Sequence, residues 1–519
     1  MSAPSGSPPG AGAGAGLPVL HRDITDLRGP LLVVRGADAV GWDEYVVVRP
    51  AAEGASGGVP DRHGVVLEVN RDLAVVQVLE GTEGLRPGST SVRFTGHPFR
   101  VPVGETWLGR VCNGRGEPLD GGPPVTGAAS RAVAGAPLNP TRRQPPAEPV
   151  LTGVSAIDAL TTLVRGQKLP VFSAAGLPHL ELAAQVAAQA STGGQPFSVV
   201  FAGLGLTHAD ADTVRGTLEA RLGAGELVLL LNTADDPVVE RVLTPRIALT
   251  VAEHLAFDRG RHVLVVLADM TSYAEAVREV SSARGELPGR RAYPGYLYSD
   301  LASLYERCGR VVGMPGSVTV LPVLTMPAAD ITHPVPDLTG YITEGQVVLS
   351  HEPHSRGIYP PVDPLSSLSR LMRRGVGPGR TREGHAEVAA QLIAALARAR
   401  QVRELSEIVG ADALNRTDRL YLRLEAAFER RLVDQGRREP RSLDATLDLC
   451  WTVLRTLPRS ELTMLSSDLL DAHLETTPPA GGDIGTVAGP GFGPVAGPGD
   501  LVDAHVETQG AAPGGGSGG

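Results

Sequence analysis

The pattern of hydrophobic and polar positions divides the chain into three parts. The first part carries short runs of β-branched residues separated by Gly, Pro and Asp, at 31–35, 44–48, 64–69 and 73–79. Short strands at regular spacing, bounded by turn residues, are typical of a small barrel. We therefore predict an N-terminal β-barrel domain at 18–97.

Apolar strands alternate with helical patterns in the second part, residues 98–380. The strand-like runs are 168–172, 197–201, 227–231 and 262–269, and the helical patterns that follow them are 180–190, 209–222, 238–255 and 273–284. Such alternation builds a parallel sheet covered by helices. The third part, residues 381–476, is rich in Ala, Leu, Arg and Glu at helical spacing and predicts a helical C-terminal domain. The fold class predicted is multidomain α/β.

Composition narrows the classes of function. A chain of 519 residues has room for about three domains, and its net charge of −10 argues against a general nucleic-acid-binding surface. Cys112, Cys308 and Cys450 are far apart and predict neither a disulfide framework nor a zinc site. No apolar run approaches the ~20 residues of a transmembrane helix, and no secretory signal is visible. We expect any membrane role to come through partners.

The two ends of the chain have a different composition. Residues 1–17 are almost uncharged, and residues 477–519 contain 14 glycines in 43 positions. Both lack the apolar content that offsets chain entropy, so we expect disordered tails. Within the second tail, residues 500–508 nearly repeat residues 468–476. The repeat is interpreted either as a local duplication or as a second docking copy of the segment.

The first strand and helix of the α/β region flank the position of a phosphate-binding loop. A working loop reads Gly-x-x-x-x-Gly-Lys-Ser/Thr, with backbone amides and a lysine for phosphate and a hydroxyl for Mg²⁺. Here Gly176 lies within the loop, but Ser173 replaces the first glycine and Pro178 replaces the second and removes an amide. His179 replaces the lysine and Leu180 the hydroxyl. We predict a degenerate loop with weak or no phosphate binding; an ordinary strand–helix turn is the alternative.

Two further residues bear on this site. Lys168 is the only lysine among 47 basic residues, and it lies on the wrong side of the loop to replace the missing one. Asp269 ends an apolar strand, which is the Walker B-like pattern for a carboxylate that binds Mg²⁺. The same pattern also fits a structural aspartate at the carboxyl edge of a sheet.

Several long, collinear runs between residues 21 and 474 resemble one family, the non-catalytic B subunit of the A-type and V-type rotary ATP synthases and ATPases. The runs are 172–179, 181–185, 287–301, 330–346, 359–363, 367–372 and 415–422. The resemblance implies an N-terminal β-barrel, a central RecA-like, P-loop-type parallel-sheet domain with a degenerate phosphate loop, and a C-terminal helical bundle. It also implies no independent ATPase activity.

The resemblance further implies an alternating ring of three catalytic A and three B subunits, which works in ion-gradient-coupled ATP synthesis or hydrolysis, including hydrogen ion transport. Mg-ATP or ADP would lie at the interface with the A subunit, and no cofactor is required by this chain itself. The other partners implied are the central rotor stalk and the peripheral stalk, with no nucleic acid. Membrane contact is expected only through the ion-translocating sector, which gives a peripheral location on the cytoplasmic face of the cell membrane.

The resemblance assigns roles to individual residues. Arg370 matches the arginine finger that acts in trans, with Arg373 and Arg374 as rivals. Tyr341 is expected near a subunit interface, where it either packs or contacts nucleotide. Leu206 takes the place of the glutamate that activates the attacking water in the family's catalytic subunits. His333 is expected to be a hydrogen-bonded structural histidine.

Two other functions stand as alternatives to this one. An autonomous P-loop ATPase is disfavoured, because the loop has no lysine and Leu206 cannot accept a proton. A scaffold or binding protein that has left the rotary complex would form no stable association with an A subunit.

Overall fold

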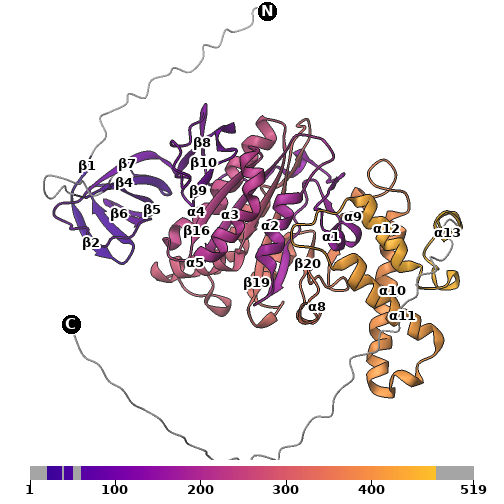
Figure 1. Ribbon diagram of the computed structural model, residues 1–519. Helices are drawn as coiled ribbons and strands as arrows, with labels where there is room; N and C mark the ends of the chain where they lie inside the picture. Colours follow the sequence, from indigo (N-terminus) through magenta and orange to yellow (C-terminus); the bar gives the residue numbers. More distant parts are fainter. Residues whose placement is uncertain (1–19, 38–39, 51–59, 475–519) are drawn as a thin grey trace, which may run out of the picture.

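Three structural parts lie in a row in the computed structural model, which describes residues 20–37, 40–50 and 60–474. The strands of the first part lie at one end, a sheet with helices lies in the middle, and a group of helices lies at the other end (Figure 1). The predicted tails 1–17 and 477–519, and with them the repeat copy 500–508, lie outside the described residues.

The first part is a seven-stranded antiparallel sheet in the order β1-β7-β4-β5-β6-β3-β2. Its strands are β1 (Leu20–His21), β2 (Ile24–Arg28), β3 (Leu31–Arg35), β4 (Glu44–Arg49), β5 (Arg62–Asn70), β6 (Leu73–Val78) and β7 (Ser91–Pro98). Leu32 and Val34 of β3 and Val76 of β6 are fully buried, while alternate residues are partly exposed. This period of two lets one face of each strand build the barrel core.

The central part is a mainly parallel sheet in the order β21-β20-β14-β19-β17-β15-β16-β9. These strands are β9 (Val111–Asn113), β14 (Val171–Ala174), β15 (Phe197–Leu206), β16 (Leu227–Thr233), β17 (His262–Ala268), β19 (Ser317–Met326), β20 (Gly345–Val348) and β21 (Leu368–Ser369), which is antiparallel to β20. Six short strands lie beside this sheet or at its edge. β8 (Arg100–Val103) pairs with β10 (Ala129–Ala132), and β12 (Pro149–Val150) pairs with β13 (Leu163–Val164), as separate two-stranded sheets. β11 (Arg143–Gln144) pairs with β18 (Gly309–Val311), which pairs with β19.

Both faces of this sheet are covered, which explains why its strands are continuous apolar runs. Val199 and Phe201 of β15 belong to one core cluster, and the alternate residues Val200 and Ala202 belong to a second. The helices around the sheet are α1 (Ser155–Leu160), α2 (His179–Gln189), α3 (His208–Gly223), α4 (Val238–Glu253), α5 (Met270–Ala283), α6 (Leu297–Tyr305), α7 (Pro334–Ile342), α8 (His351–Ser355) and α9 (Met372–Gly375). The predicted multidomain α/β fold is confirmed.

Two strands differ from their predicted extents for local reasons. The strand predicted at 168–172 begins at Val171, because Pro170 has no amide to donate to a ladder. The strand predicted to end at Phe201 continues to Leu206. Its glycines weaken the sequence signal, but pairing with β16 continues across a bulge near Leu204.

The third part consists of α10 (His385–Val409), α11 (Arg416–Ala427), α12 (Leu443–Leu454) and α13 (Ser467–Leu474). Its core is continuous with that of the sheet domain through α1. The Ser155 hydroxyl of α1 lies 2.9 Å from the Thr446 hydroxyl of α12, and the Ser155 amide donates to Gln435 Oε1 at 3.0 Å. No helix among the described residues is long and apolar enough to span a membrane.

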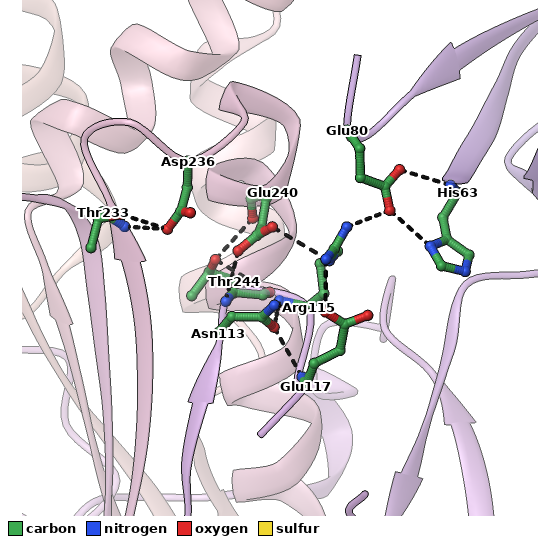
Figure 2. Close-up of polar contacts among 10 residues, drawn as sticks. His63, Glu80, Asn113, Arg115, Glu117, Thr233, Asp236, Glu240 and Thr244 are labelled. Carbon is green, nitrogen blue, oxygen red and sulfur yellow. Dashed lines mark hydrogen bonds and ion pairs between the residues drawn. The ribbon is translucent and has the colours of Figure 1, made fainter. Parts of the chain in front are cut away.

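An arginine connects the barrel to the central domain (Figure 2). Arg115, in the turn after β9, donates through Nη1 to Glu80 of the barrel and through Nη2 to Glu117 at 2.7 Å. Glu80 in turn accepts from the His63 amide at 2.7 Å and lies 2.8 Å from His63 Nδ1. The junction between the two domains is therefore polar and depends on charge.

Glu240 of α4 lies on the inner side of the same cluster. Its side chain is 3% exposed, accepts from the Gly114 amide at 2.9 Å, and lies 3.5 Å from Arg115 Nε. Burial raises the pKa of Glu240 to about 7, against the opposing charge of Arg115 and with further support from the nearby carboxylate of Asp236. Between about pH 4.5 and about pH 7, the folded chain therefore holds a proton here that the unfolded chain has released.

This difference predicts a pH-dependent stability. Because the folded pKa is raised, the stabilisation is complete below the unfolded value near 4.5 and is lost as pH rises through about 7. Glu240→Gln removes the titration, so the variant should gain about 2–3 kcal/mol on the parent between pH 5 and pH 8. Denaturant unfolding of both chains at several pH values measures this, with Glu117→Gln at the exposed side of the cluster as control. Parallel pH profiles of parent and Glu240→Gln would contradict the assignment.

Candidate functional site

A cleft of about 340 Å³ lies at the carboxyl ends of β14, β15 and β17. The loop before α2 forms one wall, and the structure brings His179, Leu206 and Asp269 together around it. The other lining residues are Leu177, Pro178, Leu180, Glu181, Ala184, Leu204, Gly205, Thr207, Asp210, Thr213, Val214, Ser272 and Thr325. This is the place in a parallel α/β sheet where ligands are generally bound.

The loop lacks several of the donors that a working phosphate loop has. Pro178 occupies the N-cap position of α2, has no amide hydrogen and provides no side-chain cap. Ser173 is buried and its hydroxyl donates to the Ala174 carbonyl at 3.0 Å. Gly176 adopts a left-handed conformation with φ of +80°, and the His179 ring lies 2.9 Å from the Leu177 carbonyl. The loop thus differs from a working phosphate loop at the lysine, at the hydroxyl and at one backbone amide.

Asp269 serves the fold at this edge of the sheet. It caps α5, where Oδ1 accepts from the Thr271 amide at 2.7 Å and from the Thr325 amide of β19 at 3.2 Å. Oδ2 accepts from the Thr325 hydroxyl and lies 3.9 Å from His179 Nε2. Within the described ranges, no three His, Cys, Asp or Glu side chains gather closely enough to hold a metal ion.

The charged side chains that line the cleft are mainly acidic. Three carboxylates, Glu181, Asp210 and Asp269, line it. Glu181 pairs with Arg437, and Asp210 accepts from the Thr207 hydroxyl at 2.7 Å at the start of α3. Leu206 at the end of β15 contributes an apolar wall, 6% exposed, where an acid would be needed to activate water.

Lys168 forms ion pairs with two glutamates at the amino end of β14. Its side chain is 5% exposed, and Nζ lies 2.7 Å from Glu344 Oε1 and 3.1 Å from Glu306 Oε1. Its backbone amide donates to Glu344 Oε2 at 2.8 Å. The residue precedes β14, whereas the loop follows that strand, so this amine belongs to the opposite end of the strand.

Arg370 follows the edge strand β21 and is exposed. Its amide donates to the Glu344 carbonyl at 3.1 Å, and Nη1 lies 3.5 Å from the Thr343 carbonyl. Among the described residues the structure gives no carboxylate partner to Arg370, nor to its exposed neighbours Arg373 and Arg374 in α9. Most of the guanidinium donors of Arg370 therefore face solvent.

Arg370 and the loop lie at opposite ends of neighbouring strands. β14 runs parallel to β20, with Val171 paired to Val347, and the loop leaves the carboxyl end of β14. β21 runs antiparallel to β20, with Ser369 paired to Gly345 at its amino end. Arg370 therefore lies away from this chain's own cleft.

The two remaining candidates lie on α7. Tyr341 is 74% exposed, close to the Thr343 carbonyl that faces Arg370. His333 is buried at the start of the helix, where Nδ1 accepts from the Val335 amide at 3.5 Å. Burial lowers the pKa of His333, and its ring lies edge-on to Tyr293 at 5.6 Å. His333 is therefore buried and caps the start of α7.

One group beside the cleft gave no signal in the sequence. Arg437, in the segment after α11, stacks on the Tyr359 ring at 4.9 Å and pairs with Glu181 of α2. The Tyr359 hydroxyl donates to Gln185 Oε1 at 2.9 Å. These residues are far apart in the chain, so only the folded structure shows that they stand together against α2.

Three family descriptions match successive parts of the chain. They are the β-barrel domain of the ATP synthase alpha/beta family at 24–96, the nucleotide-binding domain of that family at 153–369, and the C-terminal domain of V and A type ATP synthase at 374–474. The matches follow the three structural parts in order.

Individual proteins give the same assignment. The B subunit of the A-type ATP synthase from Aeropyrum pernix is 53% identical over 455 residues, which cover 87% of this chain and 97% of that protein. The solved structure of a unique ATP synthase subunit, NeqB from Nanoarcheaum equitans, matches with a TM-score of 0.64 and 35% identity. It covers 80% of this chain and 100% of that one. The chain therefore belongs to the B-subunit family of the A-type and V-type rotary ATP synthases.

Proposed function

We propose that this chain is the non-catalytic, regulatory B subunit of a rotary ATP synthase or ATPase and that it alternates with catalytic A subunits in a three-plus-three ring. The observation that carries the proposal is Arg370. It is an exposed arginine without a carboxylate partner among the described residues, and it lies at the end of the sheet opposite to the chain's own cleft. Such a side chain is free to reach a site on a neighbouring subunit, and its place in the run 367–372 selects it over Arg373 and Arg374.

The chemistry required at that site suits a guanidinium. Charge builds on the γ-phosphoryl oxygens in the transition state, and arginine offers a planar, permanently charged donor fork that matches them. The single long contact of 3.5 Å to the Thr343 carbonyl leaves the other donors of Arg370 available. Tyr341 lies at the same edge and would contact the adjacent subunit or its Mg-ATP or ADP.

The chain's own cleft plays no part in hydrolysis under this proposal. Pro178 and His179 remove two phosphate ligands, and Leu206 removes the acid that orients water. The chain thus requires no cofactor of its own. Its activity consists of completing the A subunit's site and making that site depend on the ring's opening and closing.

The rest of the proposal concerns the assembly. The ring would contact the central rotor stalk and the peripheral stalk and would meet the membrane only through the ion-translocating sector, on the cytoplasmic face. Ion flow, of protons or sodium, would drive synthesis, and hydrolysis would drive ion flow in reverse.

Native mass spectrometry of the chain mixed with its cognate A subunit tests the assembly. A six-subunit species with three copies of each is expected, and Mg-ADP should not be needed for the B chain alone to stay folded. Absence of any complex with the A subunit would instead favour a scaffold protein that has left the rotary machine.

Asp269→Asn provides a second test, because it separates a structural carboxylate from a Mg²⁺ ligand. The side-chain amide can keep Oδ1 on the Thr271 and Thr325 amides and turn Nδ2 toward the Thr325 hydroxyl, but the hydrogen bonds lose the carboxylate's charge, so stability should fall by about 1–2 kcal/mol. Turnover of the assembled ring should change by less than about twofold, since the carboxylate touches no reacting group. A large loss of turnover with unchanged stability would show that Asp269 acts in catalysis.

A further inference from the structure

The last helix, α13, is held by a set of specific contacts rather than by its apolar side chains alone. The groove that holds it, here the α13 groove, is formed by Gly384 at the start of α10, Trp451 and Arg455 of the α12 region, and Arg459 in the following turn. These residues are all contributed by the helical domain.

Each contact involves a defined residue of α13. A Cβ on Gly384 would lie 2.7 Å from Leu469 Cδ2, so Leu469 packs directly against that backbone, and Leu470 is 6% exposed. The His473 ring stacks on Trp451 with centroids 4.3 Å apart and planes 15° apart. The groove therefore recognises leucine and histidine side chains at fixed positions.

Two arginines add polar contacts to this recognition. The Arg455 guanidinium donates to the His473 carbonyl at 2.6 and 3.2 Å, and so caps the end of the helix. Arg459 Nη1 pairs with Asp471 Oδ1 at 2.5 Å. The groove thus contacts a Leu, an apolar residue and an Asp at consecutive positions, and a His two residues after the Asp.

The same order of residues occurs a second time in the chain. Residues 500–508 are identical to residues 468–476 at seven of nine positions, and the two differences are both leucine to valine. Leu501, Asp503 and His505 reproduce the three residues with the most specific contacts, while Val502 and Val506 replace Leu470 and Leu474. All the groups that the groove recognises are therefore present in the second copy.

We propose that residues 500–508 of the same chain compete with α13 for the α13 groove. The 23 residues at 477–499 separate the two copies. At up to about 3.3 Å per residue they span far more than the ~12 Å length of α13, so the second copy reaches the groove without strain.

The two copies are expected to bind the α13 groove with different affinities. Val502 lacks a methylene that Leu470 buries, and Val506 lacks one that Leu474 buries in part; together these make the second copy roughly tenfold weaker than α13. α13 is therefore the resident occupant, and the second copy takes over when α13 is weakened or captured. The exchange changes the segment that follows the bound copy, from residues 477–519 to residues 509–519.

Disulfide trapping in the full chain tests this exchange. Arg459→Cys is combined with Asp503→Cys, and the matched control combines Arg459→Cys with Thr486→Cys, a tail position nearer in the chain but outside the repeat. Arg459→Cys with Asp471→Cys reports the resident copy. The three native cysteines are buried, and Arg459 and Asp471 are about half exposed, so the variants should fold.

In a glutathione redox buffer, the intramolecular crosslink at 503 should exceed that at 486 at least fivefold, as measured by peptide mapping. Adding Leu470→Ala, which weakens the resident copy, should raise the crosslink at 503 several-fold and leave that at 486 unchanged. Equal yields at 503 and 486 in both backgrounds would overturn the proposal. Crosslinks at 503 that form only between two chains would also overturn it, because they would identify a second copy of the chain as the occupant.

Discussion

Replacement of Arg370 by alanine is expected to lower ATP turnover of the assembled A–B ring by roughly 10³–10⁵-fold, the usual contribution of an arginine finger. The side chain is exposed and makes one long contact, 3.5 Å to the Thr343 carbonyl, so its loss should cost the fold little. The effect should appear in kcat with the ring intact, because the guanidinium acts on charge that develops in the transition state.

The neighbouring arginines provide matched controls for this prediction. Arg373→Ala and Arg374→Ala remove equally exposed cations from α9 and should leave turnover within a few-fold of the parent. Arg370→Lys keeps the charge but loses the planar fork, so it should recover only part of the rate. If the ring turns over normally with alanine at 370 and stops with alanine at 373 or 374, the finger has been assigned to the wrong residue.

The second large effect is expected at Lys168. Lys168→Met removes the cation that Glu306 and Glu344 share; Glu306 keeps its ion pair with Arg143, whereas Glu344 loses the ammonium and keeps only the backbone amide of residue 168. Removing one partner of a buried pair costs about 3–5 kcal/mol. Since both carboxylates are about one-third exposed and can hydrate, we expect a loss of about 2–4 kcal/mol, measured by denaturant unfolding.

Lys168→Arg is the conservative partner of this variant and should recover much of the stability. Rings assembled at low temperature from Lys168→Met should retain turnover per folded ring, because the amine lies at the far end of β14 from the loop. Normal stability together with lost turnover would mean that this lysine takes part in phosphate chemistry after all.

Much of the fold could be predicted from local patterns. The run 31–35 is β3 in full, and the helical pattern at 209–222 is α3, extended to His208 because Thr207 caps it by accepting from the Asp210 amide. The end of β15 could not be predicted, because Gly203 and Gly205 have low strand propensity. The strand continues there because it pairs with β16, which the local sequence does not reveal.

In the candidate site, too, some features can be predicted from residue identity and others depend on the fold. Loss of the loop's function can be predicted from residue identity alone, because proline has no amide and leucine has no hydroxyl. The position of Arg370 relative to the cleft could not, because it depends on β21 pairing antiparallel with β20. The ionic environment of Lys168 was equally hidden, since Glu306 and Glu344 lie 138 and 176 residues away in sequence.

The central claim is that this chain contributes to ATP turnover only through a neighbour's site. The most direct measurement is Mg-ATP turnover by the isolated chain, by its cognate A subunit alone and by their mixture under one set of conditions. The account predicts no turnover by the isolated chain and turnover by the mixture well above that of the A subunit alone. Hydrolysis by the isolated chain would contradict it, because the cleft beside His179 and Leu206 would then be a working active site.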